Sequence, residues 1–586
     1  MTSRSRILKY FLQQAFAHNI LELSDSIDNI SYDSECQTGG NITKNMSRVT
    51  NKKKWSSLVH NGVKFSPEYK QKHVPLIYDG KQIQLDKDAE EYALLYAKYL
   101  DTEYAQKNIF HKNFFNDWKE ILGKKSEIKS LELCDFTLMK QFLSEEKEQK
   151  KIERKEGVEK KEKKIDDDDS EYKIALVDGK EQEISNYKVE PPGLFIGRGK
   201  NPNLGKIKKR IYPEDVTINI GKESPIPKLP RYLNGHSWGN IINDRKLEWL
   251  ASWKDTVTNK TKYLWLSGNS DLKISGDVQK FEIARKLKKK YNTIIETNND
   301  NLKSTDVKIR QIATALYFID KLAIRVGNEK GDDGADTVGV TNLRIEHVDI
   351  SINNEITLNF LGKDSVPYTN TIIVGSVVFN NVKEFTKKKA KDDQVFDAIN
   401  SSDVNSYLQS FMKNLTAKVF RTYNASNIFQ KELRKITTKY GKYDTDSDEE
   451  GQKKAIVDDF IKANLKVAKL LNHQKKISKG YKGQVDKINE TVEKLKKQLA
   501  KARRSKNKKP ATIEKIQEKI KNYKSKKEIV KEMKNISLDT SKSNYVDPRI
   551  MVAFMKKHDL DVNKIFSKAL QKKFLWAFDV DESYKF

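Results

Sequence analysis

The sequence predicts an α+β protein made of several domains, on three observations. Apolar residues recur at helical spacing over long segments, for example over 309–324. Elsewhere Ile356, Leu358 and Phe360 alternate with polar residues, as on one face of a β-strand. Between residues 484 and 533 apolar side chains are spaced by three and four positions in turn, which predicts a coiled-coil seam. A chain of 586 residues is also too long for one hydrophobic core.

Residues 1–50 are polar, rich in Ser and Asn, and without sustained periodicity, so we expect a disordered tail or a targeting segment. The part before Glu22 carries Arg4, Arg6 and Lys9 but no acidic residue, which is typical of a mitochondrial presequence. The lysine run at 52–54 is typical of nuclear import signals. We therefore expect the nucleus, with the mitochondrion as the alternative.

Residues 51–243 are expected to form a mixed α/β region. Globular sequence begins near Trp55, and the apolar spacing is helical from Asp86 through Trp118. The stretch 145–164 consists almost entirely of Glu and Lys, so it is either a solvated helix with many ion pairs or disordered.

A basic loop follows, beginning at Pro191. From Gly199 to Lys206 it looks like a phosphate-binding loop, but the spacing is wrong by one residue and no Ser or Thr follows the lysine to hold magnesium. Nucleotide hydrolysis is therefore not indicated. The loop can instead bring the backbone close to a nucleic acid. Its basic residues are Arg198, Lys200, Lys206, Lys208, Lys209 and Arg210.

The composition indicates a polyanionic partner. Lys and Arg number 111 against 82 Asp and Glu, which gives a formal net charge of +29. Because basic side chains that neutralise phosphates release counterions, nucleic acid is the leading partner and an anionic membrane surface the weaker one. No apolar stretch is long enough for a spanning helix. Two cysteines and scattered histidines give no metal-ligand spacing, so no metal or other cofactor is expected.

Four segments carry candidate catalytic cations, and most of these also have a plainer interpretation. Arg325 would lie in the last turn of the helix 309–324, where complementing the helix dipole is the favoured role on sequence alone. Lys363 falls at the tip of a predicted hairpin, where most lysines are merely solvated. Arg421 can form paired hydrogen bonds to a phosphate. His473 follows an amphipathic helix, and a single histidine at such a place is usually structural.

Each of these four segments alone is weak evidence for a function. A fifth segment, residues 540–549 with the sequence Thr-Ser-Lys-Ser-Asn-Tyr-Val-Asp-Pro-Arg, makes the set specific for one family. The ordered set resembles the eukaryotic type IB DNA topoisomerases. The resemblance runs from about Trp55 to Phe586 and includes the Pro-Pro-Gly-Leu-Phe loop, Gly235-His236, the coiled-coil segment and the SKxNY motif. Five motifs in one order are far less expected by chance than any single match.

The resemblance implies a nucleophile, three phosphate ligands and a proton donor. Tyr545 would attack the scissile phosphate and stay joined to the 3′ end. Arg325, Arg421 and His473 would hold the non-bridging oxygens and stabilise the charge of the transition state. Lys363 would protonate the leaving 5′ oxygen and take the proton back on resealing. Because the two steps are symmetrical, neither ATP nor a metal would be required.

The resemblance also implies wider contacts with DNA. Arg198, Asp364 and Asn544 would surround the cleaved base pair, where camptothecin-like poisons stack. Two departures bear on local affinity and poison sensitivity: Ile196 stands where many members carry a basic residue, and Asp539 where glycine is common. A carboxylate near phosphate repels it unless the carboxylate is paired or turned outward. Further DNA contacts are expected from Lys200, Lys206, Lys209, Lys246 and Thr540.

The resemblance implies a two-lobed fold that clamps around double-stranded DNA. It also implies that the protein acts as a monomer. The fold would have a mixed α/β cap, a mainly helical, tyrosine-recombinase-like catalytic lobe and an antiparallel coiled-coil linker. The expected boundaries are 1–50 for the tail, 51–243 for the cap and DNA-binding region, 244–476 for the catalytic core, 477–534 for the linker, and 535–586 for the C-terminal domain.

Two other functions remain open. A tyrosine recombinase would use similar chemistry, but it usually carries a histidine three residues before the arginine, where this chain has Lys418. The long linker also favours relaxation over joining at defined sites. A non-catalytic chromatin or coiled-coil binding protein would explain the charge and the heptads, but not the segment around Tyr545.

Overall fold

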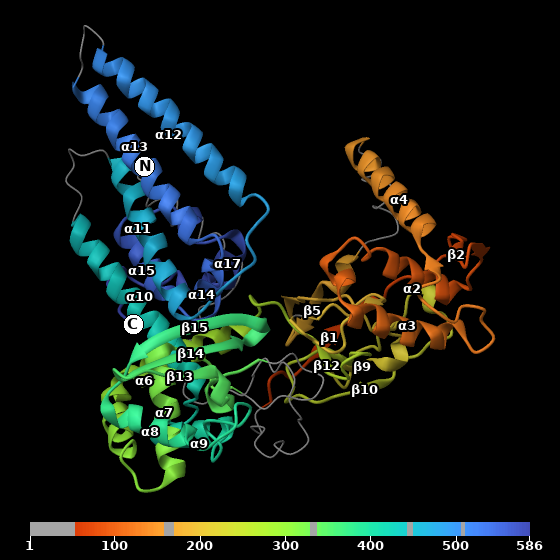
Figure 1. Ribbon diagram of the computed structural model, residues 1–586, viewed down its shortest axis with the longest axis horizontal. Coiled ribbons are helices and arrows are strands. Elements are labelled where there is room, and N and C mark those ends of the chain that lie inside the picture. Colours follow the sequence, from red (N-terminus) through yellow and green to blue (C-terminus); the bar gives the residue numbers. More distant parts are fainter. Residues whose placement is uncertain (1–52, 157–168, 198, 328–336, 442–448, 505–509) are drawn as a thin grey trace. The chain divides into compact units, whose positions relative to one another are not determined.

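The chain forms two compact units in the computed structural model (Figure 1). The amino-terminal unit holds the described residues up to Ser275 together with Thr337, and the carboxyl-terminal unit holds the others from Gly276 on. Within the described ranges, no helix combines the length and the apolar character needed to cross a membrane. The structure describes residues 53–156, 169–197, 199–327, 337–441, 449–504 and 510–586.

Short strands in small sheets characterise the amino-terminal unit. The largest sheet has the order β10-β9-β11-β12, in which β9 and β10 are parallel and the other neighbours antiparallel. The smaller sheets have the orders β1-β5-β6, β3-β2-β4 and β7-β8. The strands are β1 (Leu58–His60), β2 (Leu76–Tyr78), β3 (Lys81–Ile83), β4 (Cys134–Asp135), β5 (Ile174–Val177), β6 (Lys180–Glu183), β7 (Gly193–Leu194), β8 (Ile207–Lys208), β9 (Thr217–Asn219), β10 (Asn240–Ile242), β11 (Ala251–Lys254) and β12 (Thr261–Leu264).

Three helices of this unit share a core rich in aromatic residues. They are α2 (Lys87–Ala97), α3 (Asn108–Leu122) and α4 (Thr137–Glu156). Phe110, Phe114 and Trp118 of α3 are fully buried in it. A second, separate core contains Trp55 and Trp253 with the strands around them.

The helical pattern predicted from Asp86 through Trp118 is broken between α2 and α3. Thr102 explains the break, because its Oγ1 donates to the Tyr99 carbonyl at 2.6 Å and accepts from the Tyr104 amide at 3.4 Å. These bonds start a short 3-10 turn rather than a further turn of α-helix. Tyr99 and Tyr104 still pack against the same core, which is why the apolar spacing continues across the turn.

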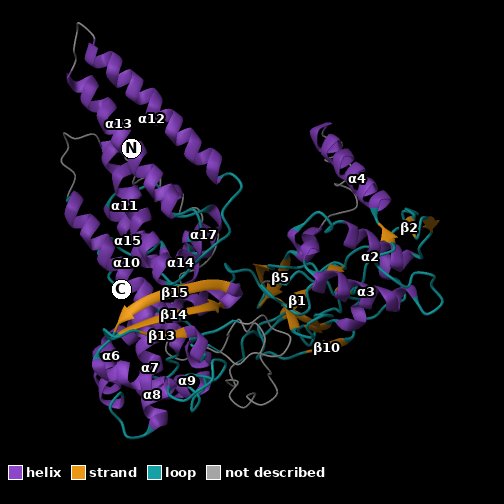
Figure 2. Ribbon diagram, viewed as in Figure 1, coloured by secondary structure: helices purple, strands orange, loops and turns teal. Residues whose placement is uncertain are grey.

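The carboxyl-terminal unit is mainly helical, with one three-stranded antiparallel sheet (Figure 2). As predicted, Ile356, Leu358 and Phe360 are buried on one face of a strand. The α+β class is therefore confirmed. Its elements are α6 (Asp271–Asn301, which begins in the amino-terminal unit), α7 (Val307–Leu322), β13 (Val348–Ile350), β14 (Glu355–Gly362), β15 (Val366–Ile373), α8 (Ser376–Thr386), α9 (Ser401–Phe411), α10 (Ala417–Tyr440), α11 (Glu449–Leu470), α12 (Tyr481–Arg504), α13 (Pro510–Glu532), α14 (Leu538–Asn544), α15 (Pro548–Lys557), α16 (Val562–Ile565) and α17 (Lys568–Lys573).

The predicted seam residues bring α12 and α13 together, and the two helices run side by side in Figure 1. Ile488 and Val492 of α12 and Ile520 of α13 form a small buried cluster. Leu495 and Tyr523 pack against it. The remaining faces of both helices are rich in Lys and exposed, so this hairpin has a narrow apolar contact and a wide basic surface.

Candidate active site

Tyr545 follows directly on α14 and is held through its backbone. Its amide donates to the Ser541 carbonyl at 3.0 Å, and its carbonyl accepts from the Ser426 hydroxyl at 3.2 Å. The same Ser426 oxygen accepts from the Asp547 amide at 3.0 Å. Ser426 lies on α10, so α10 fixes the chain on both sides of the tyrosine. The residue as a whole is only 8% exposed.

Arg421 lies on α10 and is buried against this tyrosine. Its guanidinium carbon is 5.0 Å from the centre of the Tyr545 ring. One terminal nitrogen donates to the Ala323 carbonyl, and the other donates to the Leu471 carbonyl at 3.1 Å. The Nε atom is buried and has no hydrogen-bond partner among the described residues. The ends of α7 and α11 thus fix the cation, while one donor is left available.

His473 lies three residues after α11 and is also buried. Its ring centre is 5.2 Å from that of Tyr545. The Nδ1 atom is hydrogen-bonded to the Ser541 hydroxyl at 2.7 Å. The Nε2 atom is buried and, within the described part of the chain, has no partner. One ring nitrogen is therefore engaged by the tyrosine segment, and the other is buried without a partner among the described residues.

The electrostatics of these groups are strongly coupled. Burial raises the pKa of the Tyr545 phenol, but the charges of Arg421, Arg325 and Lys418 lower that pKa by more, to about 8. Burial lowers the pKa of Arg421 to about 10, against the opposing effect of Tyr545. Burial and the two arginines lower the pKa of His473 to about 3. At neutral pH the site therefore holds a neutral imidazole beside a charged guanidinium.

Arg325 does not lie in the last turn of a helix, so this prediction was wrong. The helix α7 ends at Leu322, because Ala323 adopts a left-handed conformation with φ 49° and ψ 31°. Arg325 lies beyond it, half-buried, and its carbonyl accepts from the Val340 amide at 3.0 Å. The apolar Ile324 had extended the helical pattern, but the core buries it outside the helix. Complementing the dipole of α7 is therefore no explanation for this arginine.

Lys363 and Asp364 lie at the tip of the β14–β15 hairpin, as predicted, and both are exposed. Among the described residues the Lys363 side chain makes no hydrogen bond or ion pair, with Tyr545 or with any other group. The hairpin itself is tied to the site. The side-chain amides of Asn472 and Gln474, on either side of His473, donate to the Pro367 carbonyl at 3.1 and 3.0 Å.

The remaining predicted residues of this unit lie on α14. The Thr540 hydroxyl is 2.8 Å from that of Ser537, and the exposed Asn544 donates to the Thr540 carbonyl at 3.2 Å. The departure at Asp539 is accommodated, because this carboxylate is exposed and forms an ion pair with Lys542 at 3.1 Å. It is thus both paired and turned outward.

In the amino-terminal unit, the connection between β7 and β8 carries most of the predicted DNA contacts. Lys200 is exposed and Lys206 half-buried in this connection, Lys209 is exposed directly after β8, and Lys246 is exposed on a separate loop after β10. Lys208 forms an ion pair with Glu190, and Arg210 forms one with Glu91. Ile196 packs against the aromatic core of this unit. Arg198 lies outside the described residues, as does the tail 1–50.

Ionic contacts anchor the chain after Tyr545 to α6. Arg549 binds Asp547 at 2.8 Å and Glu282 at 2.6 Å. The Tyr584 hydroxyl donates to the same Asp547 carboxylate at 3.0 Å. Since Asp547 is fully buried, this network fixes the segment that carries the tyrosine.

Four contributing residues were not among the predicted site residues. Ser541 binds His473, Ser426 and Asp547 hold the backbone around Tyr545, and the charge of Lys418 lowers the pKa of Tyr545. Lys418 had a local signal, since it lies one helical turn before Arg421. The other three depend on contacts that no local pattern encodes.

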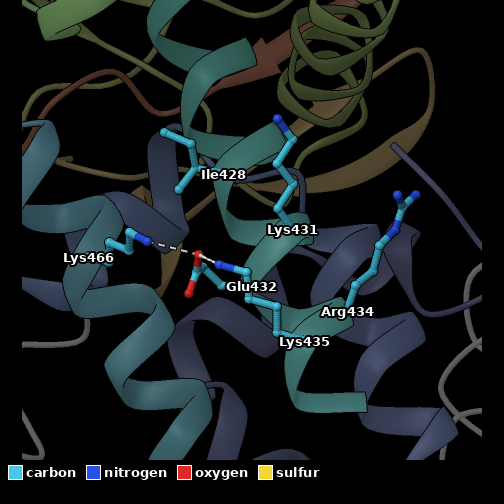
Figure 3. A pocket seen from close by; sticks show the side chains of 6 residues that line it. All are labelled: Ile428, Lys431, Glu432, Arg434, Lys435 and Lys466. Atoms are coloured by element: carbon cyan, nitrogen blue, oxygen red, sulfur yellow. Dashed lines mark hydrogen bonds and ion pairs between the residues drawn. The ribbon is translucent and has the colours of Figure 1, made fainter. Parts of the chain in front are cut away.

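A solvent-open hollow of about 410 Å³ on α10 and α11 lies apart from these residues (Figure 3). Glu432 forms ion pairs of 2.9 Å with both Lys435 and Lys466, so its carboxylate offsets part of the positive charge that lines the hollow. Lys431 and Arg434 extend away from that group. None of the predicted catalytic residues lines the hollow. The lining residues are Ile428, Lys431, Glu432, Arg434, Lys435 and Lys466.

Family models match the chain in order along most of its length. The model for the DNA-binding fragment of eukaryotic DNA topoisomerase I matches residues 53–266. The model for the catalytic core of eukaryotic DNA topoisomerase I matches residues 269–506. A C-terminal topoisomerase domain matches residues 517–586.

Curated proteins give the same result. DNA topoisomerase 1 beta of Arabidopsis thaliana is 41% identical over 571 residues, which cover 93% of this chain and 60% of the relative. DNA topoisomerase 1 of Caenorhabditis elegans is 39% identical, covering 91% of this chain and 68% of the relative. DNA topoisomerase 1 of Homo sapiens is 39% identical, covering 91% and 72%. The chain spans 60% of the length of the two plant relatives.

Proposed function

Because the chain belongs to the eukaryotic DNA topoisomerase I family, we propose that it is a type IB topoisomerase that relaxes positive and negative supercoils in double-stranded DNA. It would cut one strand, let the DNA rotate and reseal the strand. The observation that carries this proposal is the Tyr545 phenol beside a buried arginine, with the imidazole of His473 against the same ring.

Cleavage begins with the Tyr545 oxygen attacking the scissile phosphorus. A pKa of about 8 makes the phenolate accessible near neutral pH without a dedicated base. The new bond joins the tyrosine to the 3′ phosphate, and the bond to the 5′ oxygen breaks. Lys363 would give its proton to that oxygen and recover it on resealing. One ester is exchanged for another, so the proposal needs neither ATP nor a metal ion.

The transition state carries extra negative charge on the non-bridging oxygens. Arg421 and Arg325 supply positive charge there, and the buried Arg421 is held by two carbonyls before DNA arrives. Such preorganised donors act strongly in a site that excludes water. His473, neutral in the free protein, would donate through Nε2, which has no partner among the described residues.

Lys363 is the part of this mechanism that requires movement. The hairpin that carries it is tied to the His473 segment at Pro367, and Asp364 at its tip has a left-handed backbone with φ 67°. We propose that bound DNA draws the exposed lysine toward the leaving oxygen. An exposed amine at the end of a short hairpin can make such a change without disturbing the core.

The DNA contacts follow the basic surface. We propose phosphate contacts from Lys200, Lys206, Lys209 and Lys246 of the amino-terminal unit, with Arg198 added from the family resemblance. Asp364, Thr540 and Asn544 would lie near the cleaved base pair, where a camptothecin-like poison would stack. Such contacts make binding salt-sensitive and weakly sequence-selective.

The remaining proposals concern organisation. We propose a monomer that encloses DNA, a basic α12–α13 linker that slows rotation of the free DNA end, and the domain boundaries expected from the sequence. We also propose a nuclear location, with the mitochondrion as the alternative.

Relaxation of a supercoiled plasmid in EDTA, without ATP, tests the function. The protein should relax positive and negative supercoils, Tyr545→Phe should abolish relaxation, and Tyr407→Phe should preserve it. Tyr407 is the matched control, because its hydroxyl accepts from Asn301 of α6 at 2.8 Å and contacts none of the proposed catalytic residues among the described contacts. Relaxation by Tyr545→Phe would remove the proposed nucleophile. Joining of DNA partners at one defined sequence, without general relaxation, would indicate a recombinase instead.

A further inference from the structure

The buried Ser541 hydroxyl has a single partner among the described residues, the Nδ1 atom of His473 at 2.7 Å. Ser541 is fully buried. A buried hydroxyl hydrogen without an acceptor is costly, so this hydrogen points at Nδ1. The alternative, in which Nδ1–H donates to the serine oxygen, leaves the hydroxyl hydrogen without any described acceptor.

The direction of this bond decides what His473 can do. A neutral imidazole carries one hydrogen, and the nitrogen that accepts a bond cannot also carry it. If Nδ1 accepts from Ser541, the hydrogen is on Nε2, the nitrogen with no other described partner. That arrangement makes Nε2 a donor to a phosphate oxygen, whereas the other tautomer would present a repelling lone pair. Burial and the two arginines keep the ring neutral in the free protein, so its tautomer matters.

Ser541 also belongs to the turn that presents the tyrosine. Its carbonyl accepts from the amides of Tyr545 and Val546, each at 3.0 Å. The neighbouring Ser537 amide donates to the His473 carbonyl at 2.7 Å. The helix α14 therefore meets the His473 backbone and ring at once, and its docking delivers the hydroxyl together with the tyrosine.

We propose that Ser541 is a positioning residue, whose hydroxyl donates to Nδ1 and holds His473 in the tautomer that donates through Nε2. This inference rests on the proposed function for its effect on cleavage, but the tautomer itself does not. Docking of α14 then completes two parts of the site together, the nucleophile and the imidazole donor.

A double-mutant cycle separates this role from a merely structural one. Single-turnover cleavage of an oligonucleotide duplex should be slowed about tenfold by Ser541→Ala, the effect of one hydrogen bond. His473→Ala should slow it about a hundredfold. If Ser541 acts through the imidazole, the double variant should be no slower than His473→Ala alone. Additive losses would overturn the proposal.

Ser543→Ala is the matched control, because its hydroxyl lies on the same helix but bonds to the Thr540 carbonyl at 3.4 Å and the Asn544 amide at 2.9 Å, not to the imidazole. Asn544 keeps its bond to the Thr540 carbonyl in this variant. It should leave cleavage unchanged. An equal loss in Ser543→Ala and Ser541→Ala would mean that α14 is simply disturbed, and this too would overturn the proposal.

The tautomer has a direct readout that does not depend on activity. In the free full-length protein labelled with ¹⁵N-histidine, the ring signals of His473, assigned with His473→Ala, should show hydrogen on Nε2. Ser541→Ala should shift these signals toward a tautomer mixture. Unchanged signals would overturn the assignment of Ser541. If the wild-type protein failed to cleave DNA, the proposed function would fail while this measurement still tested the hydrogen bond.

Ser541→Cys guards against a variant that does not fold. Its side chain is of similar size and retains a weak S–H donor. Its cleavage rate should fall between those of Ser541 and Ser541→Ala, and it should cause no further loss in the His473→Ala background. A further loss there would contradict a role through the imidazole.

Discussion

The segment 538–586 and the α12–α13 hairpin are neighbours in sequence but are held in different ways. The hairpin is kept together by its own narrow seam, in which Ile488, Val492 and Ile520 are buried. The segment 538–586 is fixed by bonds to distant helices, from Asp547 to Ser426 and from Arg549 to Glu282. The contacts of the core therefore hold the segment that carries Tyr545, whereas the hairpin before it is held by its own seam.

The largest expected effect comes from the buried cation of the core. Arg421→Gln should slow single-turnover cleavage by about 100- to 1,000-fold, because it removes a preorganised donor from a water-excluding site. Arg434→Gln is the matched control, since Arg434 lies on the same helix but is exposed at the hollow. Similar rates for the two variants would contradict the role of Arg421.

Next in size is the anchor of the tyrosine segment. Asp547→Ala leaves Arg549 with only part of its charge compensated, and breaking such a buried pair should lower the free energy of unfolding by about 3 to 5 kcal/mol. Denaturant unfolding and limited proteolysis after α13 measure this change. The control Asp539→Ala removes an exposed pair, whose contribution is about 1 kcal/mol or less. Equal losses would mean that the segment is not anchored through Asp547.

Ionisation of the Tyr545 phenol tests whether the cations of the core act on the nucleophile. Tyrosinate absorbance of the free protein should gain a component with a pKa of about 8, which is absent in Tyr545→Phe and moves upward in Arg421→Gln. Between pH about 8 and 10 the Tyr545 phenol holds fewer protons in the native state than in the unfolded chain, so its own contribution to the free energy of unfolding should rise with pH over this range and be lost as the pH falls through 8. A component only near 10 would show that the cations do not act on this phenol.

The smallest effect is expected from the hairpin. Val492→Ala shortens a buried side chain of the seam, so it should loosen α12 and α13 without changing the single-turnover cleavage rate. Circular dichroism and the cleavage assay measure the two quantities. A loss of cleavage as large as that in Asp547→Ala would mean that the hairpin does set the position of the tyrosine.

Local patterns made parts of the fold predictable. The alternation around Leu358 located β14 and placed Lys363 at the hairpin tip, because a buried strand face has a period of two. The alternating spacing of three and four residues from Ile488 to Leu499 located the seam, because it keeps apolar side chains on one face of a helix. The end of α7 was not predictable, since Ile324 is buried by tertiary packing after Ala323 has already ended the helix.

The site divides in a similar way. Tyr545 and its four predicted partners could be named from ordered motifs, and Arg421 and His473 lie against the tyrosine ring. Ser541 and Ser426 could not be given roles, because their partners lie 68 and 119 residues away. No periodicity or spacing relates positions so far apart, and only the folded chain brings them into contact.

The bond from Arg421 to the Ala323 carbonyl gives one side chain two duties. The guanidinium satisfies the backbone where α7 stops, and the same group faces the phenol. A substitution of Arg421 therefore removes a hydrogen bond to the end of α7 as well as a positive charge. Redesigning this arginine to change reactivity would also disturb the turn that leads to Arg325.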